Sequence, residues 1–271
     1  MYLSRHTTPA GPRWAVDGKL LPAGVTLSTL LTLPDEGLPS LLAELATDGE
    51  ANGELLAPLD AQQEVWGSGV TYLRSRDARK AESETAADVY EKVYDAERPE
   101  IFFKQVGWRT VGHGQPVRLR ADTTWNVPEP ELCLVINAAS RIVGYTVGND
   151  MSSRDIEGEN PLYLAQAKTY DGSAAVGPGI RLAGADAMTD LSIHLEIERD
   201  GAVAFAGDTA TSEMKRTFPD LAAYLMRELA FPYGALLMTG TGIIPPDEFT
   251  LNKGDLVRIT IDGMTLENPV T

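Results

Sequence analysis

The chain has 271 residues, with 23 Lys and Arg against 39 Asp and Glu, and its formal net charge is -16. This acidity argues against a nucleic-acid partner, because phosphate binding needs basic patches. No apolar run approaches the roughly 18 residues that span a bilayer, so no membrane partner is expected. The N-terminus lacks the apolar segment of a secretory signal, and Cys133 is the only cysteine, which excludes an intrachain disulfide. We therefore expect a cytoplasmic protein.

The first 60 residues predict a small α+β domain. Asp17-Gly18 is typical of a hairpin turn within residues 13–21, and short helices are expected over 27–33 and 40–46. Gly, Pro and acidic residues then gather over 48–60, which is typical of a boundary. The expected domains are 1–60 and 61–271.

After residue 64 the pattern changes to one charged helical stretch and many strands. The helical stretch covers residues 74–95, and one further helix begins near Phe218-Pro219. Strands are expected over 65–67, 101–103, 131–136, 142–147, 191–198, 202–206 and 256–261. Many antiparallel strands with few helices predict an α+β, β-rich fold, either a sandwich or a roll.

The sharpest motif is Pro128-Glu129-Pro130-Glu131, directly before an apolar strand. Residues two apart in a strand face the same side, so Glu129 and Glu131 direct two carboxylates at one point. Two adjacent anions repel each other unless a cation or a proton neutralises them. The pair indicates a metal site, and the alternative is a solvated strand edge.

The hairpin that follows adds a third carboxylate. With a turn near Ala139, Glu129 lies opposite Asn149, and Asp150 is the next residue. A regular strand would point Asp150 to the wrong face, so this site needs the strand to end or bulge at Asn149, which Gly148 favours. Three oxygen ligands suit Mg²⁺, Mn²⁺ or Ca²⁺ rather than zinc.

Two basic residues follow the predicted ligands. Arg154 has the planar fork that binds a substrate carboxylate, and the alternative is a structural ion pair with Asp155 or Glu157. Lys168, placed near a dication, serves as a general base or polarises a carbonyl. The alternative for Lys168 is an ordinary surface lysine.

Other candidate residues have less support. The nucleophile elbow, the phosphate loop, the zinc-protease helix and the dinucleotide fingerprint are all absent from the sequence. His113 lies in a tight glycine turn from which it could reach a cleft, and His194 is expected to be solvated. Cys133 is expected to be a small core residue.

Together these segments resemble the core signature of the fumarylacetoacetate hydrolase superfamily. The resemblance rests on residues 127–132 and 142–155, on Lys168, and on Gly240-Thr241-Gly242 ahead of Gly254-Asp255. It extends from Val65 to the C-terminus. It implies a β-rich roll behind a small N-terminal domain, and a catalytic domain that pairs into a homodimer or a dimer-based oligomer.

The resemblance also implies a metal and a substrate class. The two Glu and one Asp ligands of the family correspond here to Glu129, Glu131 and Asp150, and the family metal is usually Mg²⁺. In the family this metal chelates the carboxylate and the 2-keto oxygen of a pyruvate-type 2-oxo acid. The family reactions are C–C hydrolysis, decarboxylation, tautomerisation and dehydration, all through a metal-stabilised enolate.

One departure separates the branches of the family. Its hydrolases carry a catalytic His shortly after a Tyr in the first motif, whereas this chain has no His between His6 and His113. Residues 69–76 and 157–163 instead resemble the 2-keto-3-deoxy-pentonate (arabinonate or xylonate) dehydratase branch, whose product is 2,5-dioxopentanoate. We predict this branch. The alternatives are a C–C hydrolase of the fumarylacetoacetate or acylpyruvate type, and a catalytically silent metal-binding relative that acts as a sensor or scaffold.

The predicted mechanism gives each candidate residue a role. Lys168 removes the C3 proton, and Glu82 protonates the leaving C4 hydroxyl unless it is only a surface helix residue. Tyr72, Arg154 and Thr241, together with Lys168, are expected to contact the substrate. The helical stretch 74–95 is expected to close over the site and exclude water.

Overall fold

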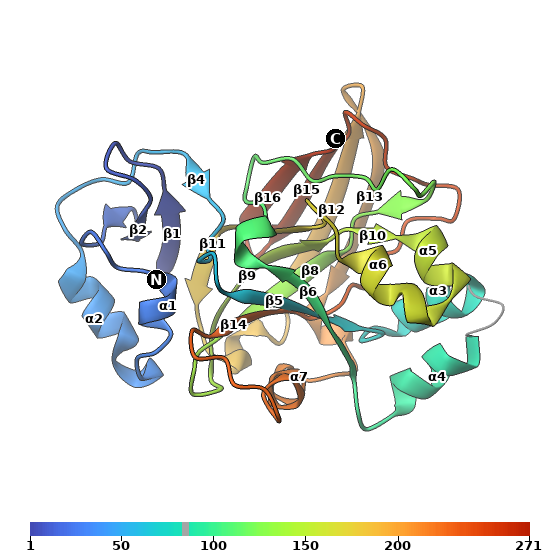
Figure 1. The fold of residues 1–271 in the computed structure, drawn as a ribbon, viewed down its shortest axis with the longest axis horizontal. Helices are drawn as coiled ribbons and strands as arrows, with labels where there is room; N and C mark the ends of the chain where they lie inside the picture. Colours follow the sequence, from blue (N-terminus) through green and yellow to red (C-terminus); the bar gives the residue numbers. More distant parts are fainter. Residues whose placement is uncertain (83–86) are drawn as a thin grey trace.

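Two packed β-sheets form the body of the molecule (Figure 1). The computed structural model describes residues 1–82 and 87–271, and the side chains outside residues 79–90. Within these residues the larger sheet has ten strands. In spatial order they are β3 (Lys19–Leu20), β2 (Arg13–Val16), β1 (Tyr2–His6), β11 (Ala174–Leu182), β9 (Ile142–Asp150), β8 (Pro130–Ile136), β14 (Ala235–Met238), β5 (Glu64–Gly69) and β6 (Glu100–Val106), with β4 (Leu55–Leu56) paired to β1.

The smaller sheet packs on one face of the larger one. Its strands are, in order, β13 (Ala202–Ala210), β12 (Ser192–Arg199), β15 (Leu256–Ile261) and β16 (Met264–Pro269). A separate short pair joins β10 (Ser152–Ser153) to β7 (Asn126–Val127). The α-helices in the described residues are α1 (Leu27–Leu30), α2 (Leu38–Leu45), α3 (Leu73–Glu82), α4 (Ala87–Asp95), α5 (Arg154–Glu159), α6 (Leu164–Lys168) and α7 (Phe218–Leu225).

Short sequence signals explain much of the local structure. Three hairpins turn at Asp-Gly pairs in which both residues have positive φ, namely Asp17-Gly18, Asp200-Gly201 and Asp262-Gly263. Such pairs favour the two-residue turns whose twist matches that of the strands. Helix α7 begins after Thr217, whose hydroxyl accepts a hydrogen bond from the N–H of Asp220.

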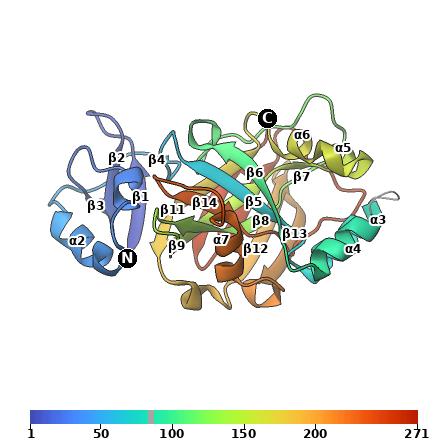
Figure 2. The ribbon, with the colours of Figure 1, turned by 60° about the horizontal axis from the view of Figure 1, so that its bottom comes forward.

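The hydrophobic core occupies both faces of the larger sheet. On one face, Leu134 of β8 belongs to one buried cluster with Leu195 and Ile259 of the smaller sheet. On the other face, Cys133 and Val135 pack in a second cluster with the leucines of α1 and α2. The N-terminal elements therefore cover one end of this face, and α3 to α6 lie at the opposite end of the molecule in both views (Figure 2).

The predicted α+β, β-rich fold is confirmed, and so are the predicted core position of Cys133 and the exposure of His194. The sequence analysis missed β1, β11, β14 and β16, and also the two-residue strands β4, β7 and β10. Strand β11 contains two Gly and one Pro, residues that are typical of turns rather than strands. Within the predicted helical stretch 74–95, the described residues belong to α3 and α4. No helix in the described part of the chain is both long and apolar enough to cross a membrane.

Candidate active site

The β8–β9 hairpin carries all three predicted metal ligands. Glu131 pairs with Gly148, and the N–H of Asp150 donates to the carbonyl oxygen of Glu129 at 3.0 Å. Residues directly opposite in an antiparallel pair share a face, as do residues two apart along a strand. Glu129, Glu131 and Asp150 therefore point to the same side of the sheet.

The predicted register of this hairpin is wrong by one residue. We expected the strand to end or bulge at Asn149, but β9 runs regularly through Asn149 to Asp150. The irregularity lies near the turn instead, where Val143 is an extra residue without a partner in β8. One extra residue moves every later side chain to the other face, and this brings Asp150 to the side of the glutamates.

The three carboxylates form one buried acidic cluster. Each residue is at most 3% exposed, and one oxygen from each lies within 4.8 Å of the others. Burial raises the pKa of Glu131, and the charges of Asp150 and Glu129 raise it further. The N–H of Gly240 donates to Oε2 of Glu131 at 2.6 Å. Gly240 has a φ of +90°, a left-handed conformation that glycine adopts without strain.

Lys168, the last residue of α6, extends into this acidic cluster. Its Nζ lies 2.6 Å from Oε2 of Glu129, 3.3 Å from Oδ2 of Asp150 and 2.6 Å from Oγ of Ser152. The ring of Phe102 lies 5.7 Å from the same Nζ. Only 3% of the Lys168 side chain is exposed, so the alternative of a surface lysine is wrong.

Arg154 is a second cation of the cluster. It is 1% exposed, and its Nη2 lies 3.0 Å from Oε1 of Glu129. The carboxylate of Asp155, one of the alternative partners, instead accepts hydrogen bonds from Thr123 and Thr124. Arg154 therefore binds a carboxylate of the cluster itself, although it is not among the lining residues of the pocket described below.

The sequence analysis did not single out Lys104 or Glu100, which both lie on β6. Lys104 is fully buried, and its Nζ lies 2.5 Å from Oδ1 of Asp150. Burial lowers the pKa of Lys104. The only signal in the sequence is that Lys104 directly follows the apolar run Ile-Phe-Phe. A lysine at that position of a strand is equally consistent with a solvent-facing side chain.

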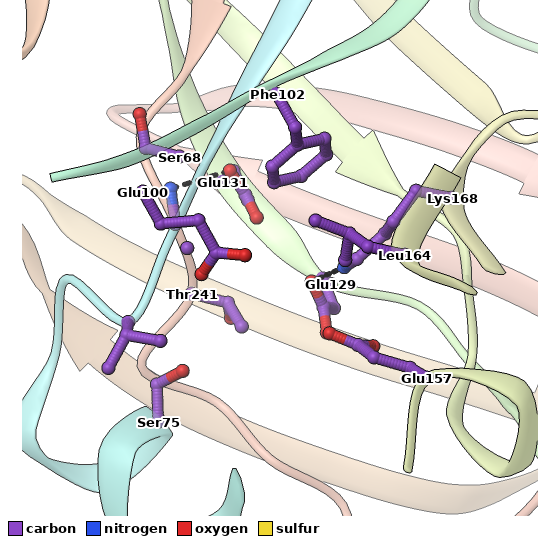
Figure 3. A pocket seen from close by; sticks show the side chains of 13 residues that line it. Ser68, Ser75, Glu100, Phe102, Glu129, Glu131, Glu157, Leu164, Lys168 and Thr241 are labelled. Atoms are coloured by element: carbon purple, nitrogen blue, oxygen red, sulfur yellow. Dashed lines mark hydrogen bonds and ion pairs between the residues drawn. The ribbon is translucent and has the colours of Figure 1, made fainter. Parts of the chain in front are cut away.

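Glu129 and Glu131 of this cluster line a small pocket (Figure 3). Glu100 directs its carboxylate into this pocket from β6, and Glu157 also lines it. A Cβ at Gly69 would lie only 2.0 Å from Oε2 of Glu100, so the carboxylate has its place only because residue 69 is glycine. The remaining lining includes Ser68, Val70, Ser75, Phe102, Leu164 and Thr241.

The other predicted site residues divide into those at the pocket and those away from it. Thr241 lines the pocket, whereas Tyr72 and His113 are not among its lining residues. Tyr72 is 1% exposed, and its hydroxyl has no hydrogen-bond partner among the described residues. Burial raises the pKa of Tyr72, which keeps this hydroxyl protonated. The side chain of Glu82 lies outside the described residues.

The donor set fits a divalent hard cation. Three carboxylates converge, and carboxylate oxygen is the ligand type that Mg²⁺ prefers. Glu100 and Glu157 of the pocket lining add two carboxylates to the three of the cluster, and the described cations that contact the cluster are Lys104, Lys168 and Arg154. With every group ionised, the acids exceed the cations by two charges, which one divalent cation neutralises.

Residues 64–271 match the family described as fumarylacetoacetate (FAA) hydrolase C-terminal. The chain belongs to this family. The match begins at the first residue of β5 and includes every pocket residue described above. The family resemblance drawn from the ligand motifs is therefore confirmed.

Two relatives within the fumarylacetoacetate hydrolase family are similar over most of the chain. A Haloferax volcanii protein named "Probable 2-keto-3-deoxyxylonate dehydratase" is 46% identical over 231 residues, which cover 84% of this chain and 79% of the relative. A 2-dehydro-3-deoxy-D-arabinonate dehydratase from Saccharolobus solfataricus is 44% identical over 221 residues, which cover 79% of this chain and 73% of the relative.

Solved structures that are similar to this chain include a dehydratase of the same kind. An apo form of 2-keto-3-deoxy-D-arabinonate dehydratase has a TM-score of 0.83 and 34% identity, and the match covers 100% of this chain and 99% of that one. A structure of 2-keto-3-deoxy-D-arabinonate dehydratase in complex with magnesium and 2,5-dioxopentanoate has a TM-score of 0.79 at 34% identity, with the same coverage.

Proposed function

We propose that this chain is a Mg²⁺-dependent dehydratase that converts a 2-keto-3-deoxy-pentonate into 2,5-dioxopentanoate. One observation carries the proposal: Glu129, Glu131 and Asp150 converge in a buried cluster with the amine of Lys168, and this cluster adjoins a small pocket. The relatives named as pentonate dehydratases support the substrate class. The structure with magnesium and 2,5-dioxopentanoate supports the metal and the product for the relative that contains them.

The three carboxylates are the proposed metal ligands. A divalent cation held there supplies Lewis-acid stabilisation of the negative charge that develops on a 2-oxo acid when it loses its C3 proton. Arg154 and Thr241 are proposed to hold the substrate, since the first is a buried cation beside Glu129 and the second lines the pocket. Tyr72 remains a predicted contact, although it does not line the pocket.

Lys168 is the proposed base. Its Nζ accepts the C3 proton, and the electron pair left at C3 forms the C3–C4 double bond as the C4 hydroxyl leaves with a proton as water. A proton then moves from C5 to C3, and the resulting enol becomes the C5 aldehyde. This aldehyde and the C2 ketone are the two carbonyl groups of 2,5-dioxopentanoate.

An acid must protonate the leaving hydroxyl. Glu82 is the acid predicted from the sequence. Glu100 is a second candidate, because its carboxylate enters the pocket from β6 (Figure 3), while the carboxylates of Glu129 and Glu131 belong to the proposed ligand set. We favour Glu100 on this geometry.

The remaining sequence-based predictions are carried forward as part of the proposal. They are a homodimer or dimer-based oligomer, a cytoplasmic location, the division into domains 1–60 and 61–271, closure of residues 74–95 over the site, and Mn²⁺ or Ca²⁺ as possible replacements for Mg²⁺.

Turnover with authentic substrates tests the function. The protein is incubated with Mg²⁺ and either 2-keto-3-deoxy-arabinonate or 2-keto-3-deoxy-xylonate, and the product is followed by NMR. We expect the C5 aldehyde of 2,5-dioxopentanoate to appear with at least one of these acids and to be lost after chelation with EDTA. A protein that binds Mg²⁺ but turns over neither acid would instead be a silent relative or a different family enzyme.

A further inference from the structure

We infer that Lys104 is a positioning residue for the metal centre, because its ammonium fixes the carboxylate of Asp150 and the end of helix α6 at the same time. The inference rests on the proposed metal site. Neither the ligand motifs nor the proposed reaction uses Lys104.

The ammonium of Lys104 makes one ion pair and two hydrogen bonds. Nζ lies 2.5 Å from Oδ1 of Asp150 and donates to the carbonyl oxygen of Met151 at 2.9 Å. It also donates to the carbonyl oxygen of Lys168. Two of the three N–H donors of the ammonium therefore have carbonyl acceptors, its charge pairs with Asp150, and the residue is 0% exposed.

These contacts divide the two oxygens of Asp150 between two lysines. Oδ1 faces Lys104, and Oδ2 lies 3.3 Å from Nζ of Lys168 on the side of the other carboxylates. A carboxylate held by one oxygen cannot rotate freely, so its second oxygen is directed toward the cluster. Outer partners of this kind orient metal ligands and tune the affinity of the metal.

The second effect of Lys104 is on the backbone that carries the proposed base. Lys168 ends α6, and the carbonyl groups in the last turn of a helix lack partners within the helix. The ammonium of Lys104 binds one of these carbonyls and joins it to Met151, directly after β9. One side chain therefore links the strand that carries Asp150 to the helix that carries Lys168.

A β-bulge directs Lys104 to this position. In the pairing of β5 with β6, Val65 pairs with Gln105 and Trp66 pairs with Phe103, which leaves Lys104 as an extra residue. Bulges change the direction of one side chain and are frequent next to active sites. The bulge explains how the edge strand β6 directs a lysine to a carboxylate on another strand.

Charge and position make opposite predictions for a variant without this lysine. A buried ammonium beside a cation site repels the cation, so its removal should tighten Mg²⁺ binding if charge alone matters. Its removal should weaken Mg²⁺ binding if the lysine orients Asp150. The sign of the change in Mg²⁺ affinity therefore identifies the role.

The test measures Mg²⁺ affinity by calorimetric titration of the wild type, Lys104→Met and Lys168→Met, without substrate. We expect Lys104→Met to bind Mg²⁺ about 10–100-fold more weakly, the usual cost of removing an outer partner. Lys168→Met is the comparison variant, because it removes the same charge from the other oxygen of Asp150 but leaves Oδ1 paired with Lys104. Its loss of Mg²⁺ affinity should therefore be clearly smaller than that of Lys104→Met.

Equal or tighter Mg²⁺ binding by Lys104→Met would overturn the inference and leave the proposed function intact. A wild type that binds no Mg²⁺ would contradict the metal site itself, and the inference with it. If Lys104→Met does not fold, Lys104→Gln is measured in its place, because its side-chain amide keeps N–H donors. Its loss of Mg²⁺ affinity should be smaller than that expected for Lys104→Met. Failure of both variants to fold would also overturn the inference, because Lys104 would then support the fold as a whole.

Discussion

Nζ of Lys168 lies 2.6 Å from Oε2 of Glu129, so the proposed base and a proposed metal ligand share one hydrogen bond. A substitution at either residue therefore disturbs the partner as well. Glu131 gives a cleaner test of the metal site, since its carboxylate accepts a hydrogen bond from the backbone of Gly240. Lys168 is then tested by measurements that separate proton transfer from metal binding.

Glu131→Gln should abolish dehydration, because it removes a direct anionic ligand of the proposed metal. It should weaken Mg²⁺ binding by more than about 100-fold, which is the largest loss usually seen when a residue that only contacts a ligand is removed. The amide oxygen can still accept from Gly240, so the fold should persist. Calorimetric titration and thermal melting check both statements. Glu44→Gln, an exposed acid on α2, is the control and should match the wild type. Wild-type Mg²⁺ affinity in Glu131→Gln would exclude Glu131 as a ligand.

Lys168→Met should lower kcat by about 10²–10⁴, the usual contribution of a positioned base, while oxalate still binds. Methionine is similar in length and cannot accept a proton. Lys168→Arg should not restore activity, because a guanidinium does not deprotonate at working pH. Exchange of the C3 protons of pyruvate into D₂O, followed by NMR, is the direct measurement. If Lys168→Met exchanges these protons at the wild-type rate, the base is another group.

Glu100→Gln should lower kcat with little change in Mg²⁺ affinity, because Glu100 enters the pocket from β6 and lies outside the three-carboxylate cluster. A general acid contributes about 10²–10⁴ to the rate. Glu82→Gln is the paired variant, made in the same background. A large loss of kcat in Glu82→Gln alone would restore Glu82 as the acid.

Cleavage of acetylpyruvate should be weak or absent. The pocket has no histidine among its described lining residues, and the chain has none between His6 and His113 to activate water. The measurement is the loss of the enol absorbance of acetylpyruvate with Mg²⁺ present. Cleavage at a rate comparable to pentonate dehydration would favour the C–C hydrolase instead.

Stabilisation by Mg²⁺ should increase with pH. Burial raises the pKa of Glu131, so without metal the folded state holds this proton more tightly than the unfolded state, and stability falls as pH rises through the folded pKa. Mg²⁺ binds the ionised carboxylate and competes with that proton. The rise in Tm on adding Mg²⁺ should therefore be larger at about pH 7.5 than at about pH 5. Both pH values lie above the ordinary pKa of a Glu side chain. An equal rise at both pH values would contradict proton competition at Glu131.

Local patterns in the sequence predicted the acidic cluster because its members lie on one hairpin with period-two spacing. The register could not be predicted, since the bulge at Val143 depends on how the strand packs rather than on any turn residue. Lys104 was missed for a related reason. Its neighbours Met151 and Lys168 are 47 and 64 residues away along the chain, and no local pattern contains that contact.

The three carboxylates come from a single hairpin, whereas most of the pocket wall comes from other segments, including Ser68 to Ser75, Glu100, Phe102 and Thr241. The proposed metal ligands thus lie on a different part of the chain from most of the residues proposed to surround the organic acid. Substitutions in the wall can alter which acid fits or which bond breaks without disturbing the hairpin. A fold divided in this way can acquire new reactions while it retains the same metal chemistry.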